Sequence, residues 1–345
     1  MNNNNYYRNL WKTTPETIRF ALFAAFQLAL AWQLCFGQGI PEQENLKFIR
    51  VSDQAGLKDR AFLDIFQDSY GFIWFATDYG FFRFDGYEYS PYYTMPGDTN
   101  SISSNSAGIR AFQEDADSNL WVATYQGGLN KFIRSKEQFQ RVGFCKALAS
   151  NNISSILNDG QGGLWAGTMN KGLLHYCPTR QPAVKRVYPD ERVIDSLPAI
   201  NTVISLCQDQ QGRLWIGQAN GLCVYGPGKG PLYYFQPGTS PESLAGGYVT
   251  DIYQDRSGRI WVATNKGLNL WQEATHTFIR YFPNEASGLG SPQFNYIWKT
   301  YEDSHGNFWI GTNAGLLRFN VDSSRFECFV YRPADPYSIS GGAVH

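Results

Sequence analysis

The chain has 345 residues, a formal net charge of −1 and only 17% charged residues, whereas aromatic residues make up 16%. Disordered chains combine low hydrophobicity with high net charge, and this chain has neither property. Without a surplus of basic residues, the composition also argues against a nucleic-acid-binding surface. The 34 Gly and 21 Tyr residues instead favour many tight turns between aromatic-rich strands.

The first 37 residues have the order of a targeting segment. Residues 1–19 are polar and include three basic residues, residues 20–36 are almost wholly apolar, and Gly37 follows. This pattern predicts a signal peptide cleaved after Gly37. The apolar run is also at the lower limit for crossing a bilayer, so an uncleaved signal anchor is the alternative. In either case we expect residues 38–345 to be exported, with a periplasmic location.

Six copies of one sequence unit fill the rest of the chain, each centred on a Trp. An Asp lies six residues before every one of these Trp, a Gly lies three before in five copies, and a Thr lies three after in five copies. Another Gly follows the Trp by six or seven residues. Such fixed offsets indicate a repeat architecture. The six Trp are Trp74, Trp121, Trp165, Trp215, Trp261 and Trp309.

Each unit reads as four short antiparallel strands. Asp can bond its own backbone two residues on and Gly accepts a positive φ, so Asp-x-x-Gly predicts a tight turn. The strand that carries the Trp follows this turn, and two more strands come after the next Gly, as in residues 267–271 and 278–282. Four strands per repeat predict an all-β fold, a β-propeller of four-stranded blades. We expect the Trp to pack between neighbouring blades rather than to stack on sugars.

The two ends of the repeat region bear on the number of blades. Residues 46–50 resemble a fourth strand and precede the first full unit, whereas residues 335–344 repeat the pattern of residues 98–105, which leads into a new first strand. We therefore predict six complete repeats plus a leading strand in a propeller over residues 38–345. It would be an incomplete seven-bladed propeller, its seventh blade truncated naturally or in a fragment. A closed six-bladed ring is the alternative.

The sequence offers no arrangement typical of catalysis. Its six Cys form no CxxC pairs and have no His at metal-ligand spacing, so we expect no metal site. Cys207 and Cys223, which we place on adjacent strands, could pair, or could be small buried apolar residues. Acidic pairs fall in turns, and no Ser/His/Asp arrangement is evident. We predict no catalytic residue and no cofactor, with an exported propeller lyase as an alternative.

The loops between the motif Thr and the next Gly differ among the copies while the framework repeats. Loops that form a ring of binding positions would vary in this way, as would unconstrained loops. Their Tyr side chains could stack on sugar rings, and their Asn, Gln and Asp side chains could bond hydroxyl groups. The predicted ligand-binding residues are Asp78, Tyr79, Tyr125, Gln126, Asn170, Lys171, Asn220, Asn265, Lys266 and Asn313.

Residues 255–269, Asp-Arg-Ser-Gly-Arg-Ile-Trp-Val-Ala-Thr-Asn-Lys-Gly-Leu-Asn, resemble the two-component regulator propeller repeat. The resemblance covers residues 44–345 in six tandem copies. It implies the periplasmic sensor region of a hybrid two-component sensor histidine kinase of Bacteroidetes. In that family two propellers precede an immunoglobulin-like domain, a transmembrane helix and a histidine kinase. This sequence departs from the family in containing none of those later domains, so we expect no phosphotransfer from it.

The resemblance implies an extracytoplasmic propeller that senses a ligand for signal transduction. The expected partner is an oligosaccharide or another small extracellular ligand, and a homodimer through the propeller is possible. We expect no nucleic acid as a partner. Contact with the membrane would come only through the N-terminal segment or a C-terminal helix outside this sequence. The alternative function is a structural or dimerisation propeller.

Overall fold

The computed structural model describes residues 46–48, 57, 60–142, 152–179, 183–188, 201–227, 230–240, 242–286 and 290–344. The targeting segment predicted at residues 1–37 lies outside this part of the chain. None of the helices in the described part is long and apolar enough to cross a membrane. The chain divides into a larger unit, Arg60–Tyr281, and a smaller unit that combines Met1–Asp59 with Phe282–His345.

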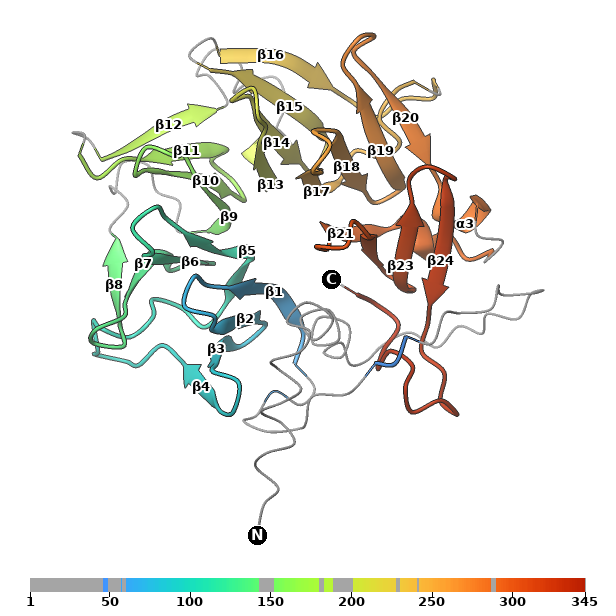
Figure 1. Ribbon diagram of the computed structural model, residues 1–345. Helices are drawn as coiled ribbons and strands as arrows, with labels where there is room; N and C mark the ends of the chain where they lie inside the picture. The colour runs from blue at the N-terminus through green and yellow to red at the C-terminus, as the bar shows by residue number, and fades with distance from the viewer. Residues whose placement is uncertain are drawn as a thin grey trace. The chain divides into compact units, whose positions relative to one another are not determined.

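The larger unit contains five four-stranded antiparallel blades, which follow one another in chain order (Figure 1). The strands are β1 (Phe62–Gln67), β2 (Ile73–Thr77), β3 (Gly80–Phe84), β4 (Tyr89–Tyr92), β5 (Ala107–Glu114), β6 (Leu120–Thr124), β7 (Gly128–Ile133), β8 (Gln138–Val142), β9 (Ile153–Asn158), β10 (Leu164–Thr168), β11 (Leu173–Tyr176), β12 (Val184–Tyr188), β13 (Val203–Gln208), β14 (Leu214–Gln218), β15 (Gly221–Gly226), β16 (Gly230–Phe235), β17 (Val249–Gln254), β18 (Ile260–Thr264), β19 (Gly267–Gln272) and β20 (Thr277–Tyr281).

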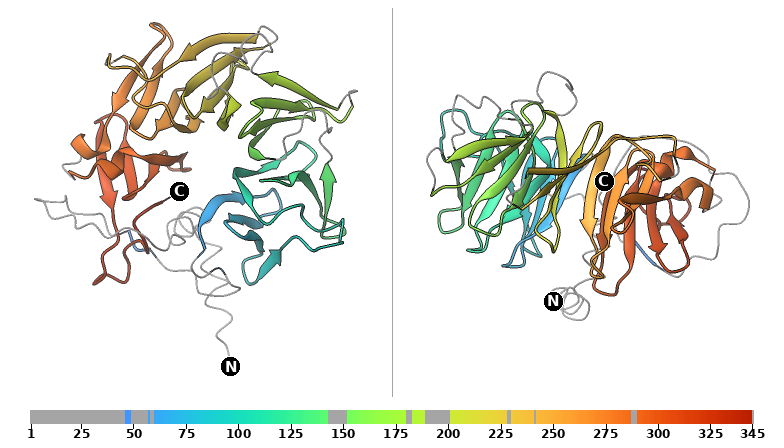
Figure 2. Two further views of the ribbon diagram at one scale, coloured as in Figure 1. Left: turned by 180° about the vertical axis from the view of Figure 1, so that it is seen from behind. Right: turned by 90° about the horizontal axis from the view of Figure 1, so that it is seen from above.

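Within this unit the first strand of each blade contacts the first strand of the next, from β1 through β5, β9 and β13 to β17. The fourth strands therefore lie on the outside (Figure 2). One parallel bridge, between Arg110 and Ser155, joins β5 to β9 and merges two blades into an eight-stranded sheet. The sheets of this unit lie side by side, and the first strand of each is its inner strand. This is the arrangement that the repeats predict for propeller blades.

The smaller unit holds the sixth blade, which has the same strand order. It consists of β21 (Ile297–Glu302), β22 (Phe308–Thr312), β23 (Gly315–Asn320) and β24 (Arg325–Phe329), preceded by α3 (Pro283–Ala286) and the 3₁₀ turn η4 (Pro292–Asn295). A core of Phe48, Trp309, Leu316, Phe329, Ile339 and Val344 covers one side of this blade. The four-stranded blades confirm the predicted all-β propeller fold.

The Asp and Trp of the repeat form a hydrogen-bonded pair in the core. One carboxylate oxygen accepts two backbone N–H groups of the turn, as Asp68 does from Tyr70 and Phe72. The other carboxylate oxygen accepts the indole N–H at 2.8–2.9 Å. The turn Gly has the positive φ that was predicted, and Ser118 adopts φ 59° in the copy without Gly. The five pairs are Asp68–Trp74, Asp115–Trp121, Asp209–Trp215, Asp255–Trp261 and Asp303–Trp309.

The indoles pack between blades, as predicted. Trp74 is fully buried, and its ring centroid lies 4.9 Å from that of Phe132 in the next blade. Trp121 reaches Tyr176 of the third blade in the same way, at 5.6 Å. Such large buried rings dominate the energy of a core. These Trp are therefore framework residues and are not available to stack on a ligand.

The third blade departs from this pattern. Nε2 of His175 lies at hydrogen-bond distance, 2.7 Å, from a carboxylate oxygen of Asp159. The buried Nε1 of Trp165 has no hydrogen-bond partner. The ring centroids of Trp165 and His175 lie 4.3 Å apart. The His therefore replaces the indole as the partner of the motif Asp in this blade.

Cations also lie over the indoles, a feature that the repeat motif did not reveal. In three blades the cation stands directly across from the Trp on the third strand, as Arg83 does for Trp74. Where that position is apolar, at Val224 and Leu270, an Arg two residues before the Trp provides the cation instead. The contacts place a basic side chain 5.4–6.0 Å from the ring centroid: Arg83, Lys131, Arg213, Arg259 and Arg318. Each such contact adds about 0.5–2 kcal/mol.

One expectation about the cysteines was wrong. Cys207 lies on β13 and Cys223 on β15, and β14 runs between them, so they are not on adjacent strands. Neither is part of a disulfide, and Cys223 is buried. The error arose because the Trp-bearing strand separates the two segments in every blade.

The motif carboxylates predict a loss of stability in acid. Burial alone would raise the pKa of Asp115 and of Asp303, but hydrogen bonds from the indole N–H, Asn side chains and turn N–H groups lower both pKa values below the usual range. A lowered pKa stabilises the folded state above the unfolded pKa of about 4, and this contribution disappears as the pH falls through the folded pKa. We expect the free energy of unfolding, measured with urea from pH 6 to pH 2.5, to fall below about pH 4. A flat profile for the Asp303→Asn variant and the parent alike would contradict this.

Candidate functional site

One end of each blade presents the turn between its second and third strands together with the linker to the next blade; we call this end the variable face. In these turns the residue after the motif Thr donates its N–H to the carbonyl of the residue that precedes the first strand, at 2.9–3.1 Å. In three of the turns the Gly donates its N–H to the linker that leads into the next blade: Gly80 to Asn105, Gly172 to Asn201 and Gly221 to Gly247, each at 2.7 Å. The turns of Gly80 and Gly172 are therefore fixed from two sides.

The motif Thr completes this arrangement. Its hydroxyl donates to the carbonyl of the following Gly at 2.8–2.9 Å in five blades. In several turns it also accepts a backbone N–H, as Thr168 does from Lys171 at 2.8 Å. A repeated scaffold thus holds unlike side chains at equivalent positions, which is the requirement for a preorganised binding surface.

The first blade places an aromatic group on this face. Tyr79 is 53% exposed, its ring centroid lies 6.1 Å from that of Tyr93, and the guanidinium of Arg60 lies 5.2 Å from its centre. Asp78 is exposed beside it. Tyr79, one of the predicted residues, therefore contacts Tyr93 and Arg60, which the sequence analysis did not select.

The second predicted tyrosine is more buried. The hydroxyl of Tyr125 lies 3.9 Å from the sulfur of Met169 in the third blade. Burial, followed by the proximity of Tyr248, raises the pKa of Tyr125 to about 12. Tyr125 therefore stays neutral near pH 7, where it can donate a hydrogen bond. Its neighbour Gln126 is exposed and has φ 65°.

The remaining predicted residues of the larger unit differ in exposure. Asn170, Asn220 and Lys266 are exposed, whereas Lys171 and Asn265 are half-buried. The side-chain oxygen of Asn265 is buried without a hydrogen-bond partner. Leaving a buried polar atom of this kind unpaired costs about 1–3 kcal/mol.

The variable face of the smaller unit carries Asn313. Its side-chain oxygen accepts the indole N–H of Trp298 at 2.5 Å, and its amide donates to Gln293 at 3.2 Å. The ring of Tyr296 lies 4.7 Å from that of Trp298. This unit therefore presents a polar and aromatic group of its own.

The residues that the sequence argument missed share a position rather than a motif. Tyr248 and Tyr296 directly precede a first strand, and their carbonyls receive the turn N–H groups described above. Tyr93 lies in a linker that follows a fourth strand. Comparing the residue before each first strand, in addition to the turns, would have identified two of these three side chains.

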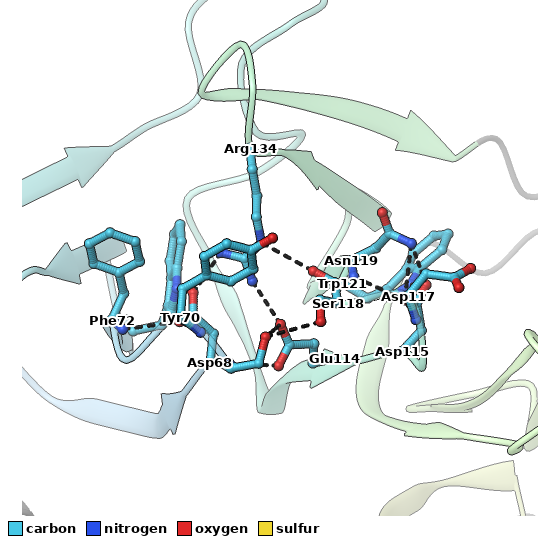
Figure 3. Close-up of polar contacts among 12 residues, drawn as sticks. Asp68, Tyr70, Phe72, Glu114, Asp115, Asp117, Ser118, Asn119, Trp121 and Arg134 are labelled. Carbon is cyan, nitrogen blue, oxygen red and sulfur yellow. Dashed lines mark hydrogen bonds and ion pairs between the residues drawn. The ribbon is translucent and has the colours of Figure 1, made fainter.

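The opposite end of the blades, which holds the Asp-x-x-Gly turns, is tied together by its own polar contacts. Figure 3 shows Arg134 between the first two blades, where it donates to Asp68 at 2.7 Å and to Glu114 at 2.9 Å. Glu114 also accepts the N–H and O–H of Ser69 at 2.8 Å, and the ring of Tyr70 stacks on the guanidinium at 4.3 Å. These carboxylates act as a clamp between blades. Among the described residues, no cluster of His, Cys, Asp or Glu is suited to a metal ion.

An ion pair also connects the inner strands of the larger unit. Arg110 on β5 pairs with Asp251 on β17, and the carboxylate of Asp64 on β1 acts electrostatically on the same guanidinium. Asp64 in turn accepts the N–H of Phe112 at 3.2 Å. These charges tie the inner strands together.

Six tandem blades with a repeated Asp–Trp pair and variable turns define a repeat propeller. The two-component regulator propeller family matches six segments of the chain, each ending five residues after the motif Trp: residues 56–79, 103–126, 147–170, 197–220, 243–266 and 291–314. The chain therefore contains six two-component regulator propeller repeats, which confirms the resemblance found in its sequence. No curated protein matches the chain.

Solved structures of bacterial propellers are similar to the chain. The extracellular domain of a hybrid two-component system from B. thetaiotaomicron is 25% identical with a TM-score of 0.69, over 85% of this chain and 38% of that one. An extracellular domain of a one-component system from the same organism is 18% identical (TM-score 0.50, 86% and 44% covered). PorZ, a surface component of the type-IX secretion system of Porphyromonas gingivalis, is 22% identical (TM-score 0.53, 72% and 37% covered). The last two show the fold alone.

The chain thus spans about two-fifths of the length of each of these three structures. The likeness to the extracellular domain of a hybrid two-component system supports a sensing propeller with an extracytoplasmic location.

Proposed function

We propose that this chain is the ligand-sensing propeller of a periplasmic two-component receptor and that it binds an oligosaccharide across its variable face. The observation that carries this proposal is the contrast between the two ends of the blades. The clamp of Arg134 and the motif Asp residues fix one end, whereas the other end presents exposed aromatic and amide side chains on a scaffold that repeats.

The chemistry of the variable face suits a sugar. Tyr79 offers a half-exposed ring, and sugars present apolar C–H faces that pack on aromatic rings. Asn170 and Asn220 are exposed, and their amides can both donate to and accept from hydroxyl groups. We expect binding without chemical change, because Asp78 is the one carboxylate among the predicted ligand-binding residues and has no second acid among them to complete an acid–base pair.

Titration calorimetry of the purified chain with neutral and uronic-acid-containing oligosaccharides tests this proposal. We expect at least one class of oligosaccharide to bind with measurable heat. If no sugar binds while the chain dimerises with concentration, the propeller is instead a structural or dimerisation module, and the sugar proposal is wrong.

The Tyr79→Ala substitution should weaken binding of such a sugar by up to about tenfold, because it removes one stacking ring. Tyr87→Ala is the matched control: Tyr87 is 69% exposed, and it lies in the turn between β3 and β4, at the opposite end of the same blade. Equal affinities of the two variants would place the ligand elsewhere.

A further inference from the structure

Two turns of the variable face carry the same three residues. The sequence Asn-Lys-Gly occurs at residues 170–172 in the third blade and at residues 265–267 in the fifth, at the same position of the repeat. None of the other four blades has a basic residue directly before this Gly, and Asp78 is the one acid in the six turns. No acid among the residues that the structure describes pairs with Lys171 or Lys266. Both lysines therefore present an unpaired positive charge on this face.

Hydrogen bonds to both neighbouring linkers hold the turn of the third blade. The N–H of Met169 donates to the carbonyl of Asn152 at 3.1 Å, and the hydroxyl of Thr202 donates to the carbonyl of Met169 at 2.7 Å. The N–H of Lys171 itself donates to the hydroxyl of Thr168 at 2.8 Å. The backbone that carries this lysine is thus already ordered, so a ligand would not have to order it on binding.

A pair of tyrosines is joined to both turns. The hydroxyl of Tyr125 lies 3.9 Å from the sulfur of Met169 in the third-blade turn. The carbonyl of Tyr248 accepts the N–H of Asn265 in the fifth-blade turn at 3.1 Å. Tyr248 also acts electrostatically on Tyr125, so the two phenols lie near each other although they come from the second blade and from the linker into the fifth.

The second and fifth blades also meet through their inner strands. Arg110 on β5 pairs with Asp251 on β17, and Asp251 lies three residues after Tyr248. Two blades lie between these strands in chain order, so the side chains that join them extend over the middle of the larger unit (Figure 1). The acid Asp64 acts on the same guanidinium. Because Arg110 is engaged by these two acids, the cations open to a ligand here are the two lysines of the turns.

The two ends of the larger unit differ in charge. At the end opposite the variable face, every blade adds the carboxylate of its motif Asp, and the turns there also hold Asp85 and Asp117. Three Arg side chains of that end are each bonded to a motif Asp: Arg134, Arg213 and Arg259. An anion therefore approaches the variable face more favourably than the opposite end.

We propose that the oligosaccharide sensed by this chain is acidic and that Lys171 and Lys266 bind its acidic groups. Tyr125 and Tyr248, beside the two turns, supply hydroxyl donors to the same groups. This inference rests on the function proposed above and adds the chemical class of the ligand and the blades that hold it. Burial raises the pKa of both tyrosines, so their hydroxyls keep their protons near pH 7. Hydrogen bonds to a charged acceptor are roughly twice as strong as those between neutral groups.

Titration calorimetry with matched sugars tests the class of ligand. The purified chain is titrated with uronic-acid oligosaccharides and their carboxyl-reduced counterparts, and with sulfated oligosaccharides and their desulfated forms. We expect one acidic sugar to bind at least about tenfold more tightly than its neutral counterpart, and this advantage to shrink as NaCl rises from about 0.05 M to about 0.5 M, because salt screens exposed charges.

The outcomes separate this inference from the function on which it rests. A neutral sugar that binds as tightly as its acidic counterpart overturns the inference and leaves the sensing of an oligosaccharide standing. If no sugar binds, both are wrong. Equal affinity for polyglutamate, a polyanion without sugar rings, would show unspecific attraction and would also overturn the inference.

Substitutions in the turns test the position of the site. Lys171→Gln and Lys266→Gln should each weaken binding of the acidic sugar by about threefold to tenfold, with an unchanged melting temperature. Tyr248→Phe keeps the ring but removes the hydroxyl, and should weaken binding by about threefold. Lys136→Gln is the matched control, because Lys136 is exposed in the turn between β7 and β8 at the opposite end. Parent-like affinity of both turn variants, or an equal loss in the control, contradicts the proposal.

Discussion

Replacing Trp74 with Ala should lower the free energy of unfolding by about 3–5 kcal/mol, which is the usual cost of deleting a large buried aromatic ring. Trp74 is fully buried, and its ring meets Phe132 of the next blade. The substitution also leaves Asp68 without its indole donor, which was bonded at 2.9 Å. Both losses act at the contact between two blades, so the effect should spread beyond the first blade.

Trp165→Ala is the matched comparison. Trp165 occupies the same position of the repeat but is only partly buried, and its Nε1 makes no hydrogen bond, because His175 takes the carboxylate. We expect this variant to lose clearly less stability than Trp74→Ala. Urea unfolding followed by circular dichroism, rather than by Trp fluorescence, would measure both variants. Equal losses would show that the Asp–Trp bond and complete burial add nothing beyond the ring itself.

The framework could be predicted from sequence because its determinants are local and occur six times. The turn of Asp255 and Gly258 needs only a carboxylate and, three residues later, a positive φ, and the sequence shows both residue types directly. The packing of the Trp between blades followed from its presence in every copy. The six copies of the repeat could thus be compared with one another, which is not possible in a sequence without repeats.

The cations over the indoles could not be predicted because they have two sources. Arg83 contacts its Trp from the neighbouring strand, whereas Arg213, which directly precedes β14, contacts Trp215 from two residues earlier in the chain. The strand register decides which position faces the ring, and an apolar residue at one position is compensated by Arg at the other. A search for one fixed offset cannot find such an alternation.

The variable face could be predicted only in part for a similar reason. Its turns lie at fixed offsets from the Trp, so Tyr79 and Tyr125 could be selected. Tyr93 and Tyr248 come from linkers of unequal length, and their approach to those turns depends on hydrogen bonds between distant backbone groups, such as that from Asn265 to Tyr248. Side chains that converge in this way become visible only in the folded chain.

The Gly221→Ala substitution should cost about 2–4 kcal/mol, because two separate penalties act at this turn. Gly221 has φ +136°, a conformation that L side chains rarely adopt, and an added Cβ would lie 2.4 Å from the carbonyl oxygen of Phe235. Its N–H also donates to Gly247 of the linker, so relieving the clash would shift a contact between two blades.

Gly230→Ala separates the two penalties. Gly230 has φ +81°, but an added Cβ would meet nothing within 4 Å, so this variant should lose only about 1–2 kcal/mol. Urea unfolding of both variants gives the difference that is due to the clash. Because Asn220 directly precedes Gly221, the first variant should also disturb the variable face, whereas Gly230 lies at the turn between β15 and β16. If Gly230→Ala weakened an oligosaccharide as much as Gly221→Ala did, the loss would reflect general instability, and the turn of Asn220 would have no particular part in binding.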